Sequence, residues 1–350
     1  MLIRPMAGVA GAAALAAVLL PAPARAAEEV RIAAGRPGTP WHAFAVALAR
    51  RYEAAVPGGK AVTIARGNGY WNPIVVNARR AEFGLSNAAS AAWAYRGDET
   101  AYRKKKYTDI RAVMAGLQPV WIAAMLRVDY VRNTGHDTLD RALRAGRGAP
   151  RIVMEPFSSL VPIVADRILA SMGSSRRIVR ERRGDILQVG AAQIPSMIRG
   201  ERADLYFEAV GPVRAAALGA ALADHARFVD LPPAALAALT RTGAAAYSTA
   251  LRPARRGRAV KTVDLGTVLI VHRNVGNRVV RAMLRVLIDD REVLARSHAE
   301  WRDYAPSPYE ALKTRGVPMH PAAASFFRER GWTELAKRGR IPLPRRKPRR

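Results

Sequence analysis

The sequence predicts an α/β protein with two lobes, each a mostly parallel sheet flanked by helices. Strand-like and helix-like segments alternate along the chain, as they do where helices connect and cover parallel strands. The alternation comes in two successive series. Two long apolar segments, 120–128 and 262–272, are placed to carry the chain from one lobe to the other and back. Half of the 350 residues are hydrophobic, which is ample for two cores.

The first series of predicted elements occupies residues 30–116. We expect Asn72 to be the N-cap of the second helix, because Pro73 suits the first helical position. The predicted strands are 30–34, 61–65, 82–85 and 110–116, and the predicted helices are 41–56, 72–80 and 88–95.

The second series begins at residue 151, and Gly173 and Gly200 are its expected helix stops. Its predicted strands are 151–154, 186–189 and 204–207, and its predicted helices are 160–172 and 193–199; helices 278–294 and 322–330 follow. We expect residues 27–125 and 266–335 to form a discontinuous first lobe, 126–265 the second lobe, and 336–350 a basic disordered tail.

Residues 1–26 have the pattern of a secretory signal peptide. A basic start precedes an apolar core at 8–20, which is too short to span a bilayer comfortably, and Ala24-Arg25-Ala26 fits a cleavage site. We therefore expect export to the periplasm and cleavage near Ala26; an uncleaved N-terminal anchor is the alternative. The absence of cysteine excludes disulfides and thiolate metal sites.

The formal net charge of +29 admits two interpretations. The excess could attract an anionic partner such as a carboxylate, a nucleic acid or a lipid headgroup. It could also reflect a compositional preference for arginine, which we favour. Basic runs such as 103–106 and 344–350 lack the interleaved aromatic residues of a single-strand binding platform. We expect no nucleic-acid partner.

The first predicted strand runs into a Gly/Pro turn that opens a long helix. This layout places unpaired N–H groups and the positive end of the helix dipole at the carboxyl edge of the sheet. Backbone N–H groups of the turn or the hydroxyl of Thr39 would approach a ligand there. The imidazole of His42 could donate a hydrogen bond to a carboxylate. The candidate ligand-binding residues are Gly35, Gly38, Thr39, Trp41 and His42.

Polar residues near the ends of later strands are further candidates. Asn72 could bind a ligand or only cap its helix, and Asn87 follows the third strand at a cleft-facing position. Ser158 and Ser159 precede a helix, where hydroxyls cap the helix or bind an anion. Glu155 would repel an anion unless it faced a ligand amine or an arginine.

An enzyme needs a nucleophile, an acid/base pair or a metal site. The six histidines are widely spaced, and neither a Gly-x-Ser-x-Gly elbow nor a Walker loop occurs. We expect no catalytic residue, no metal site and no cofactor.

Four elements, in order, resemble a known family. They are AAGRPGTPWHAFA, ARGNGYWNPIVVNARRAEFGLSNAASAAWAYRGDE, MIRGERADLYFEAVGP and VPMHPAAASFFRERG. Together they resemble the TAXI-type solute-binding subunits of tripartite ATP-independent periplasmic (TRAP) transporters over about residues 30–331. Gly69 stands where that family often has Ser, Ala89 where it often has an acid, and Arg36 where it favours a small residue. The resemblance therefore implies that the chain has the family's fold but different side chains in the ligand pocket. Gly69 is added to the candidate ligand-binding residues.

The resemblance and the two-series layout imply a type II-like, two-lobed periplasmic binding protein. Such a protein captures a small organic acid or amino acid between its lobes and delivers it to the TRAP membrane subunit, its only membrane contact. The alternative is a binding protein of the same fold that serves an ABC importer or a sensor. A basic envelope protein that holds polyanions is a third class, supported by charge alone.

Overall fold

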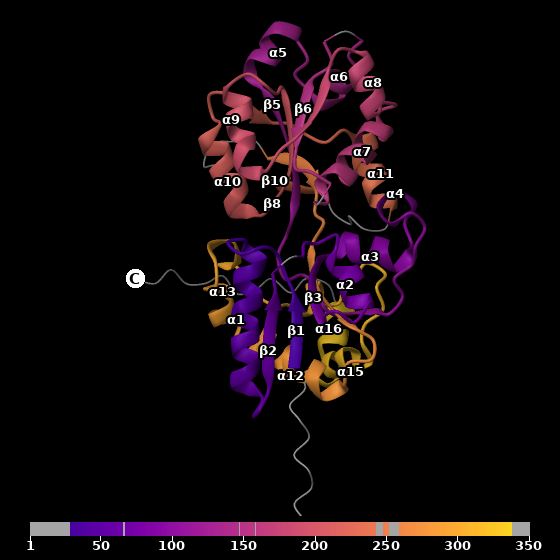
Figure 1. The fold of residues 1–350 in the computed structure, drawn as a ribbon, viewed down its shortest axis with the longest axis vertical. Coiled ribbons are helices and arrows are strands. Elements are labelled where there is room, and N and C mark those ends of the chain that lie inside the picture. Colours follow the sequence, from indigo (N-terminus) through magenta and orange to yellow (C-terminus); the bar gives the residue numbers. More distant parts are fainter. Residues whose placement is uncertain are drawn as a thin grey trace, which may run out of the picture.

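The computed structural model describes residues 29–65, 67–146, 148–157, 159–242, 248–251 and 259–337. Two lobes are stacked along its long axis (Figure 1). This confirms the predicted fold class. The predicted signal peptide, Ser158 and the part of the predicted tail after Lys337 lie outside the described residues.

The first lobe contains a five-stranded sheet in the order β2-β1-β3-β12-β4. Its first three strands are parallel, and β12 lies antiparallel between β3 and β4. The strands are β1 Glu29–Ala33, β2 Lys60–Ile64, β3 Phe83–Asn87, β4 Ile110–Met114 and β12 Thr267–His272.

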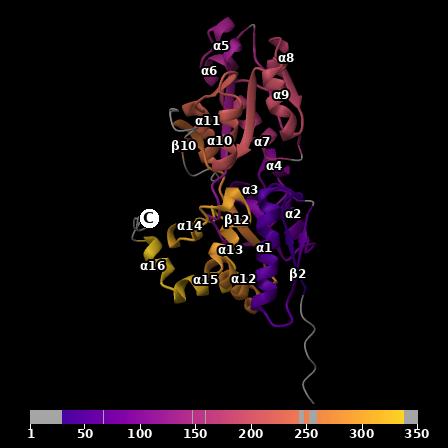
Figure 2. The same ribbon diagram turned by 90° about the vertical axis from the view of Figure 1, so that its left-hand side faces the viewer.

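Helices cover both faces of this sheet. Buried side chains of α1, α12 and α15 pack on one face, and those of α2 and α3 pack on the other. Figure 2 shows α12, α15 and α16 on the same lobe as α1, although nearly the whole chain separates them in sequence. The helices are α1 Pro40–Ala55, α2 Asn72–Asn77, α3 Ala88–Arg96, α4 Glu99–Tyr102, α12 Asn277–Asp289, α13 Arg291–Ala295, η2 Ala299–Trp301, α14 Pro308–Ala311, α15 Pro321–Glu329 and α16 Trp332–Lys337.

The second lobe contains a sheet in the order β7-β6-β8-β5-β9. The strands β6, β7 and β8 are parallel, and β5 runs antiparallel to β8 and to β9. The strands are β5 Trp121–Arg127, β6 Arg151–Met154, β7 Asp185–Gln188, β8 Leu205–Val210 and β9 Ala226–Phe228; β10 Ser248–Leu251 pairs with β11 Val260–Val263 in a separate hairpin.

The helices of the second lobe also lie on both faces. Buried residues of α9 and α10 pack on one face of the sheet, and those of α6, α7 and α11 on the other. They are α5 Val128–Thr134, α6 Leu139–Arg144, α7 Val161–Ser171, α8 Arg176–Glu181, η1 Ala191–Gln193, α9 Ile194–Arg199, α10 Pro212–Ala221 and α11 Pro233–Arg241. No helix among the described residues is both long and apolar enough to cross a membrane.

Two short segments, 115–120 and 264–266, connect the lobes. They are tied to each other: Asp264 Oδ1 accepts from the N–H groups of Val120 (2.9 Å) and Gly266 (2.7 Å). The predicted continuous strand 262–272 is therefore wrong, because Gly266, with φ +62°, breaks it into β11 and β12. The predicted boundary between residues 125 and 126 falls inside β5, all of which belongs to the second sheet.

Three other predicted elements differ in extent. The helix predicted at 72–80 stops at Asn77, because Arg79 has φ +53° and leaves the helical region. The helix predicted at 278–294 divides into α12 and α13 at Asp290. The segment 336–337, predicted as tail, belongs to α16.

Candidate functional site

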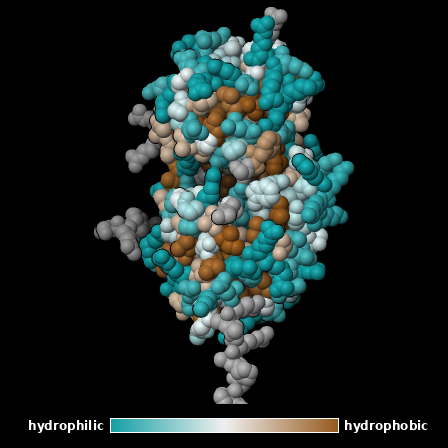
Figure 3. Space-filling model, in the orientation of Figure 1, coloured by the Kyte–Doolittle hydropathy of each residue, from teal (hydrophilic) through white to brown (hydrophobic). Residues whose placement is uncertain are grey.

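The carboxyl ends of the parallel strands of the two lobes face each other. In the second lobe, β5 starts directly after the crossing segment 115–120, so the antiparallel β8, and β6 and β7 with it, end toward the first lobe. β1, β2 and β3 end toward the second lobe (Figure 1). The surface is hollowed between the lobes (Figure 3). Ligands of open α/β sheets bind at such edges, so this cleft is the candidate site.

The turn after β1 encloses one of its own side chains. Thr39 is the N-cap of α1: its Oγ1 accepts from His42 N–H (3.4 Å) and donates to Arg36 C=O (2.6 Å). A Cβ on Gly35 would lie 2.4 Å from that same Oγ1. Position 35 has to be glycine because the Thr39 hydroxyl occupies the space that a side chain would need. The exposed Gly38 has a different role, since the turn needs a positive φ there, +81°.

Trp41 and His42 are half-buried in the first turn of α1. The indole of Trp41 reaches the second Gly-rich turn, because a Cβ on Gly69 would lie 3.0 Å from Trp41 Cη2. Trp41 therefore joins the two turns of this lobe.

Asn87 and Gly69 lie in close contact. A Cβ on Gly69 would lie 2.0 Å from Asn87 Oδ1, so a serine cannot replace this glycine without moving Asn87. Asn87 Nδ2 donates to Gly266 C=O (3.3 Å), and Ser86 Oγ donates to Gly69 C=O (2.7 Å). Asn87 thus links the turn after β2 to a crossing segment.

Asn72 is fully buried and is not an N-cap; Trp71 takes that position, which corrects the prediction. Its Nδ2 donates to the carbonyls of Leu85 (2.6 Å) and Ala33 (3.2 Å), which ties the ends of β3 and β1 together. Its Oδ1 lies against Gly67, where a Cβ would come within 1.8 Å. The inward-facing amide stabilises the sheet edge, and this placement does not bring it into the cleft.

The second lobe brings Ser159 and Glu155 together. Ser159 Oγ accepts from Val161 N–H (3.3 Å) at the start of α7, and it hydrogen-bonds the Glu155 carboxylate. Burial raises the pKa of Glu155. The Ser159 hydrogen bond and the charges of Arg36 and Arg214 oppose that rise. Arg36 belongs to the first lobe and Arg214 to the second, so charges on both sides of the cleft act on the pKa of Glu155.

The pair Glu208 and Arg214 was not among the predicted site residues. Glu208 Oε1 accepts from Arg214 Nε (3.0 Å), and Oε2 accepts from Nη2 (3.3 Å). Burial raises the pKa of Glu208 to about 7 against the attraction of Arg214, and the charges of Glu155 and Glu300 add to the rise. A charged residue within the apolar strand LYFEAV was the signal that could have identified it.

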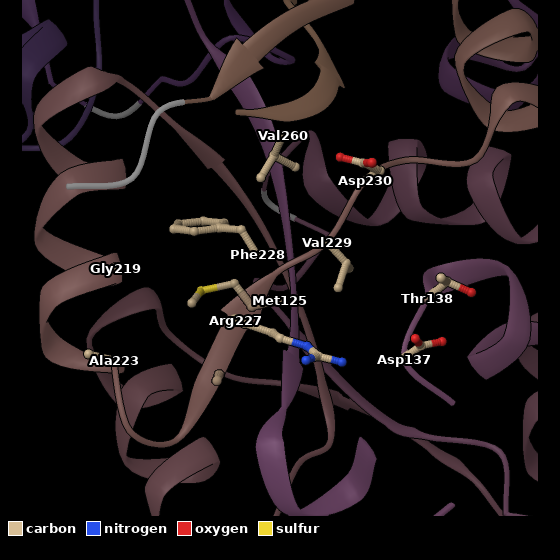
Figure 4. A pocket seen from close by; sticks show the side chains of 11 residues that line it. Met125, Asp137, Thr138, Gly219, Ala223, Arg227, Phe228, Val229, Asp230 and Val260 are labelled. Atoms are coloured by element: carbon tan, nitrogen blue, oxygen red, sulfur yellow. The ribbon is translucent and has the colours of Figure 1, made fainter. Parts of the chain in front are cut away.

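A separate hollow of about 530 Å³ lies beside the edge strand β9 of the second lobe (Figure 4). Phe228, Met125 and Val260 line one part of it, and Arg227 and Asp137 another. None of the predicted site residues lines it. Within the described ranges, no group of three or more His, Asp or Glu side chains is arranged to hold a metal ion.

The comparisons with known proteins give one family. Residues 32–331 match the model of a family described as the NMT1-like family. No curated protein matches the chain.

Solved structures with a similar fold include three binding or ligand-bound proteins. The periplasmic aliphatic sulphonate binding protein SsuA of Escherichia coli is 15% identical over 86% of this chain and 78% of its own, with a TM-score of 0.43. A probable amino-acid ABC transporter extracellular-binding protein of Bacillus subtilis is 10% identical over 79% and 97%, with a TM-score of 0.44. A Xanthomonas citri protein bound to ATP is 10% identical over 87% and 99%, with a TM-score of 0.49.

Proposed function

This chain belongs to the NMT1-like family, and from that premise we propose that it is an extracytoplasmic solute-binding protein. It captures a small solute in the cleft between its lobes and delivers it to a membrane transporter. Export through the predicted signal peptide is part of this proposal, so the exported protein would begin near Ala27.

One observation carries the proposal: charges of both signs, from both lobes, meet at the carboxyl ends of the strands. Glu155 follows β6, Glu208 lies near the end of β8, and Arg214 lies at the start of α10. The charge of Arg36, which follows β1, acts on Glu155 from across the cleft. A small polar solute bound there would touch both lobes, which is what couples binding to lobe closure.

The charges also favour one class of solute. A simple carboxylate would meet the attraction of Arg36 and Arg214 together with repulsion from Glu155 and Glu208. A solute with both an ammonium and a carboxylate group matches the two signs. Within the predicted class of small organic acids and amino acids, we therefore propose an amino acid or a similar zwitterion.

The predicted ligand-binding residues have different roles under this proposal. Thr39, Trp41, His42 and Ser159 are proposed to contact the solute. The glycines at 35 and 69 act indirectly, since they leave room for the Thr39 and Asn87 side chains. Asn72 stabilises the frame of the first lobe.

The membrane partner of this protein could belong to either of two transporter classes. An ABC transporter is named for one of the similar structures reported above, and a TRAP transporter for none of them. An ABC importer is therefore the partner to test first. The TRAP membrane subunit remains the expectation that the TAXI resemblance implies. Neither partner would make the chain an enzyme.

The experiment is a thermal-shift screen of amino acids, dicarboxylates, alkanesulfonates and neutral sugars. A true ligand at one hundred times its Kd should stabilise the protein by about 2.7 kcal/mol. We expect an amino acid to stabilise most. A protein that responds to no small solute, and instead binds an oligonucleotide tightly at physiological salt, would contradict the proposal and favour the polyanion class.

Glu155→Gln tests the zwitterion in particular. It should weaken amino-acid binding about tenfold or more and leave dicarboxylate binding equal or stronger, because the repulsive charge is gone. Asp140→Asn, on an exposed helix of the second lobe, is the matched control and should change neither. Equal loss for both solute classes would mean that Glu155 only supports the loop.

A further inference from the structure

We infer that this protein holds its two lobes together by two side chains exchanged across the cleft: Glu300 of the first lobe on the N-terminus of α10, and Arg167 of the second lobe between Trp93 and Asp98. Arg214 takes part in the first contact only through its backbone N–H, and neither Glu300 nor Arg167 is among the residues proposed to bind the solute. The inference goes beyond the proposed function, since it concerns the protein without any solute.

The Glu300 carboxylate occupies the amino end of a ten-residue helix. Its Oε1 accepts from Arg214 N–H (2.5 Å), and its Oε2 accepts from Val213 N–H (3.1 Å). Pro212 is the first residue of α10 and has no N–H, so these are the first two donors that the helix offers. A carboxylate is stabilised there both by the hydrogen bonds and by the helix dipole. Glu300 is only 9% exposed.

The surroundings of Glu300 fit this contact closely. A Cβ on Gly211 would lie 2.4 Å from Glu300 Oε2, so only glycine lets the carboxylate reach the helix. Gln118, on a crossing segment, donates from Nε2 to Glu300 C=O (3.2 Å). The next residue, Trp301, is fixed to the first lobe by its indole N–H, which donates to Pro40 C=O (2.8 Å), and by stacking on Phe44. Glu300 is thus presented by a rigid element.

The Arg167 contact runs in the opposite direction. Arg167 extends from α7 of the second lobe, and its guanidinium lies 4.5 Å from the centre of the Trp93 ring in α3 of the first lobe. Its Nη2 donates to Asp98 Oδ1 (2.5 Å). Both side chains of this ion pair are largely buried, with exposures of 11% and 18%. A cation–π contact is stronger when it is desolvated, and removing one partner of a buried ion pair leaves the other charge unpaired.

The two contacts lie on opposite flanks of the crossing segments. The helix α10 is on one side of the molecule, and α3, α4 and α7 are on the other (Figure 1). A movement that separates the lobes on either flank breaks the contact on that flank. The arrangement of the lobes in this structure therefore has a stabilisation of its own, and a solute adds to it rather than creating it.

The test measures the lobe separation in the full chain without solute. Because the chain has no cysteine, Ala216→Cys in α10 and Val293→Cys in α13 give two unique exposed labelling sites, one per lobe. With a spin label at each cysteine, pulsed electron paramagnetic resonance should give a single distance distribution centred at a short distance. Glu300→Ala combined with Arg167→Ala should shift most of the distribution to longer distances.

Two further measurements keep the test decisive if the double variant folds poorly. Glu300→Gln keeps the side-chain volume but loses the charge, and it should add a longer-distance population. In the same variant, the amide hydrogens of Val213 and Arg214 should exchange with solvent at least about tenfold faster. The neutral glutamine amide is a weaker hydrogen-bond acceptor for these two N–H groups than the Glu300 carboxylate. Glu99→Gln, an exposed acid of the first lobe, is the control and should change nothing.

An unaltered distance distribution in folded Glu300→Gln and in the folded double variant would overturn the inference. So would a reference protein that is already open without solute. Either result would leave the proposed solute-binding function untouched, because no solute enters the experiment.

Discussion

The cleft edges of the two lobes are built from the same kind of strand-to-helix turn but carry different chemistry. In the first lobe, glycines lie against neutral oxygen atoms of Thr39, Asn72 and Asn87. In the second lobe, the corresponding edge carries Glu155 and the Glu208–Arg214 pair. The difference teaches that strand-to-helix turns of the same kind can be filled by neutral side chains in one lobe and can carry buried charge in the other.

The largest effect should come from breaking the charged edge. Arg214→Ala leaves the Glu208 carboxylate, 7% exposed, without its cation. We expect a loss of about 3 kcal/mol in the free energy of unfolding at pH 8. The loss should be smaller at pH 5, because Glu208 can then take up a proton. Denaturant unfolding at both pH values measures this.

Arg132→Ala is the matched control, since its ion pair with Asp129 is exposed and contributes little. If Arg214→Ala cost the same at pH 5 as at pH 8, the Arg214 effect would be one of packing, and the comparison of the two edges would lose its electrostatic basis.

The pH dependence of stability tests Glu208 itself. Its pKa of about 7 in the folded protein lies above the ordinary value of 4.5, so the folded state binds the proton more tightly than the unfolded state. The protonated group therefore stabilises the fold below pH 4.5, and this contribution, roughly 3 kcal/mol at most, is lost as the pH rises to about 7.

Glu208→Gln should remove most of that decline between pH 4.5 and pH 8, as followed by denaturant unfolding at several pH values. The remaining slope would come from other groups, including Glu155, whose pKa is raised in the same direction. An unchanged slope in the variant would assign the pH dependence elsewhere.

The neutral edge should be sensitive to volume rather than to charge. Gly69→Ala places a methyl group 2.0 Å from Asn87 Oδ1, and we expect a loss of about 1–3 kcal/mol that does not vary with pH. Gly146→Ala, where a Cβ meets nothing within 4 Å, is the control.

A double-mutant cycle sharpens this point. Gly69→Ala with Asn87→Ala should cost clearly less than the sum of the two single changes, because removing the amide makes room for the methyl group. Simple additivity would show that the close contact is not the cause.

The smallest effect concerns helix capping in the two lobes. Thr39→Ala and Thr138→Ala each remove an N-cap that accepts one N–H bond, so both should cost about 1 kcal/mol in thermal or denaturant unfolding. Only Thr39 lies at the cleft, so only Thr39→Ala should also weaken the binding of an amino acid found by the screen. Equal effects on binding would remove Thr39 from the proposed site.

The sequence predicted the strand–helix alternation well because alternation depends on local hydrophobic patterns. The breaks at Gly266 and Arg79 were missed, since a positive φ in the middle of an apolar or helical pattern leaves the pattern unchanged. The site was harder. Gly35, Gly69 and Asn87 were predicted as ligand-binding residues, but whether a turn glycine faces a ligand or its own chain depends on where Thr39 and Asn87 point.

By itself, the sequence determined the two-lobed α/β fold class and the positions of the turns at the strand ends, because periodicity, prolines and glycines act over a few residues. Only the tertiary structure decided which side chains meet. Glu208 and Arg214 are six residues apart and pair through a strand and a helix, whereas Glu300 reaches Arg214 N–H across 86 positions. Contacts of that kind arise from the packing of whole lobes, and no local pattern encodes them.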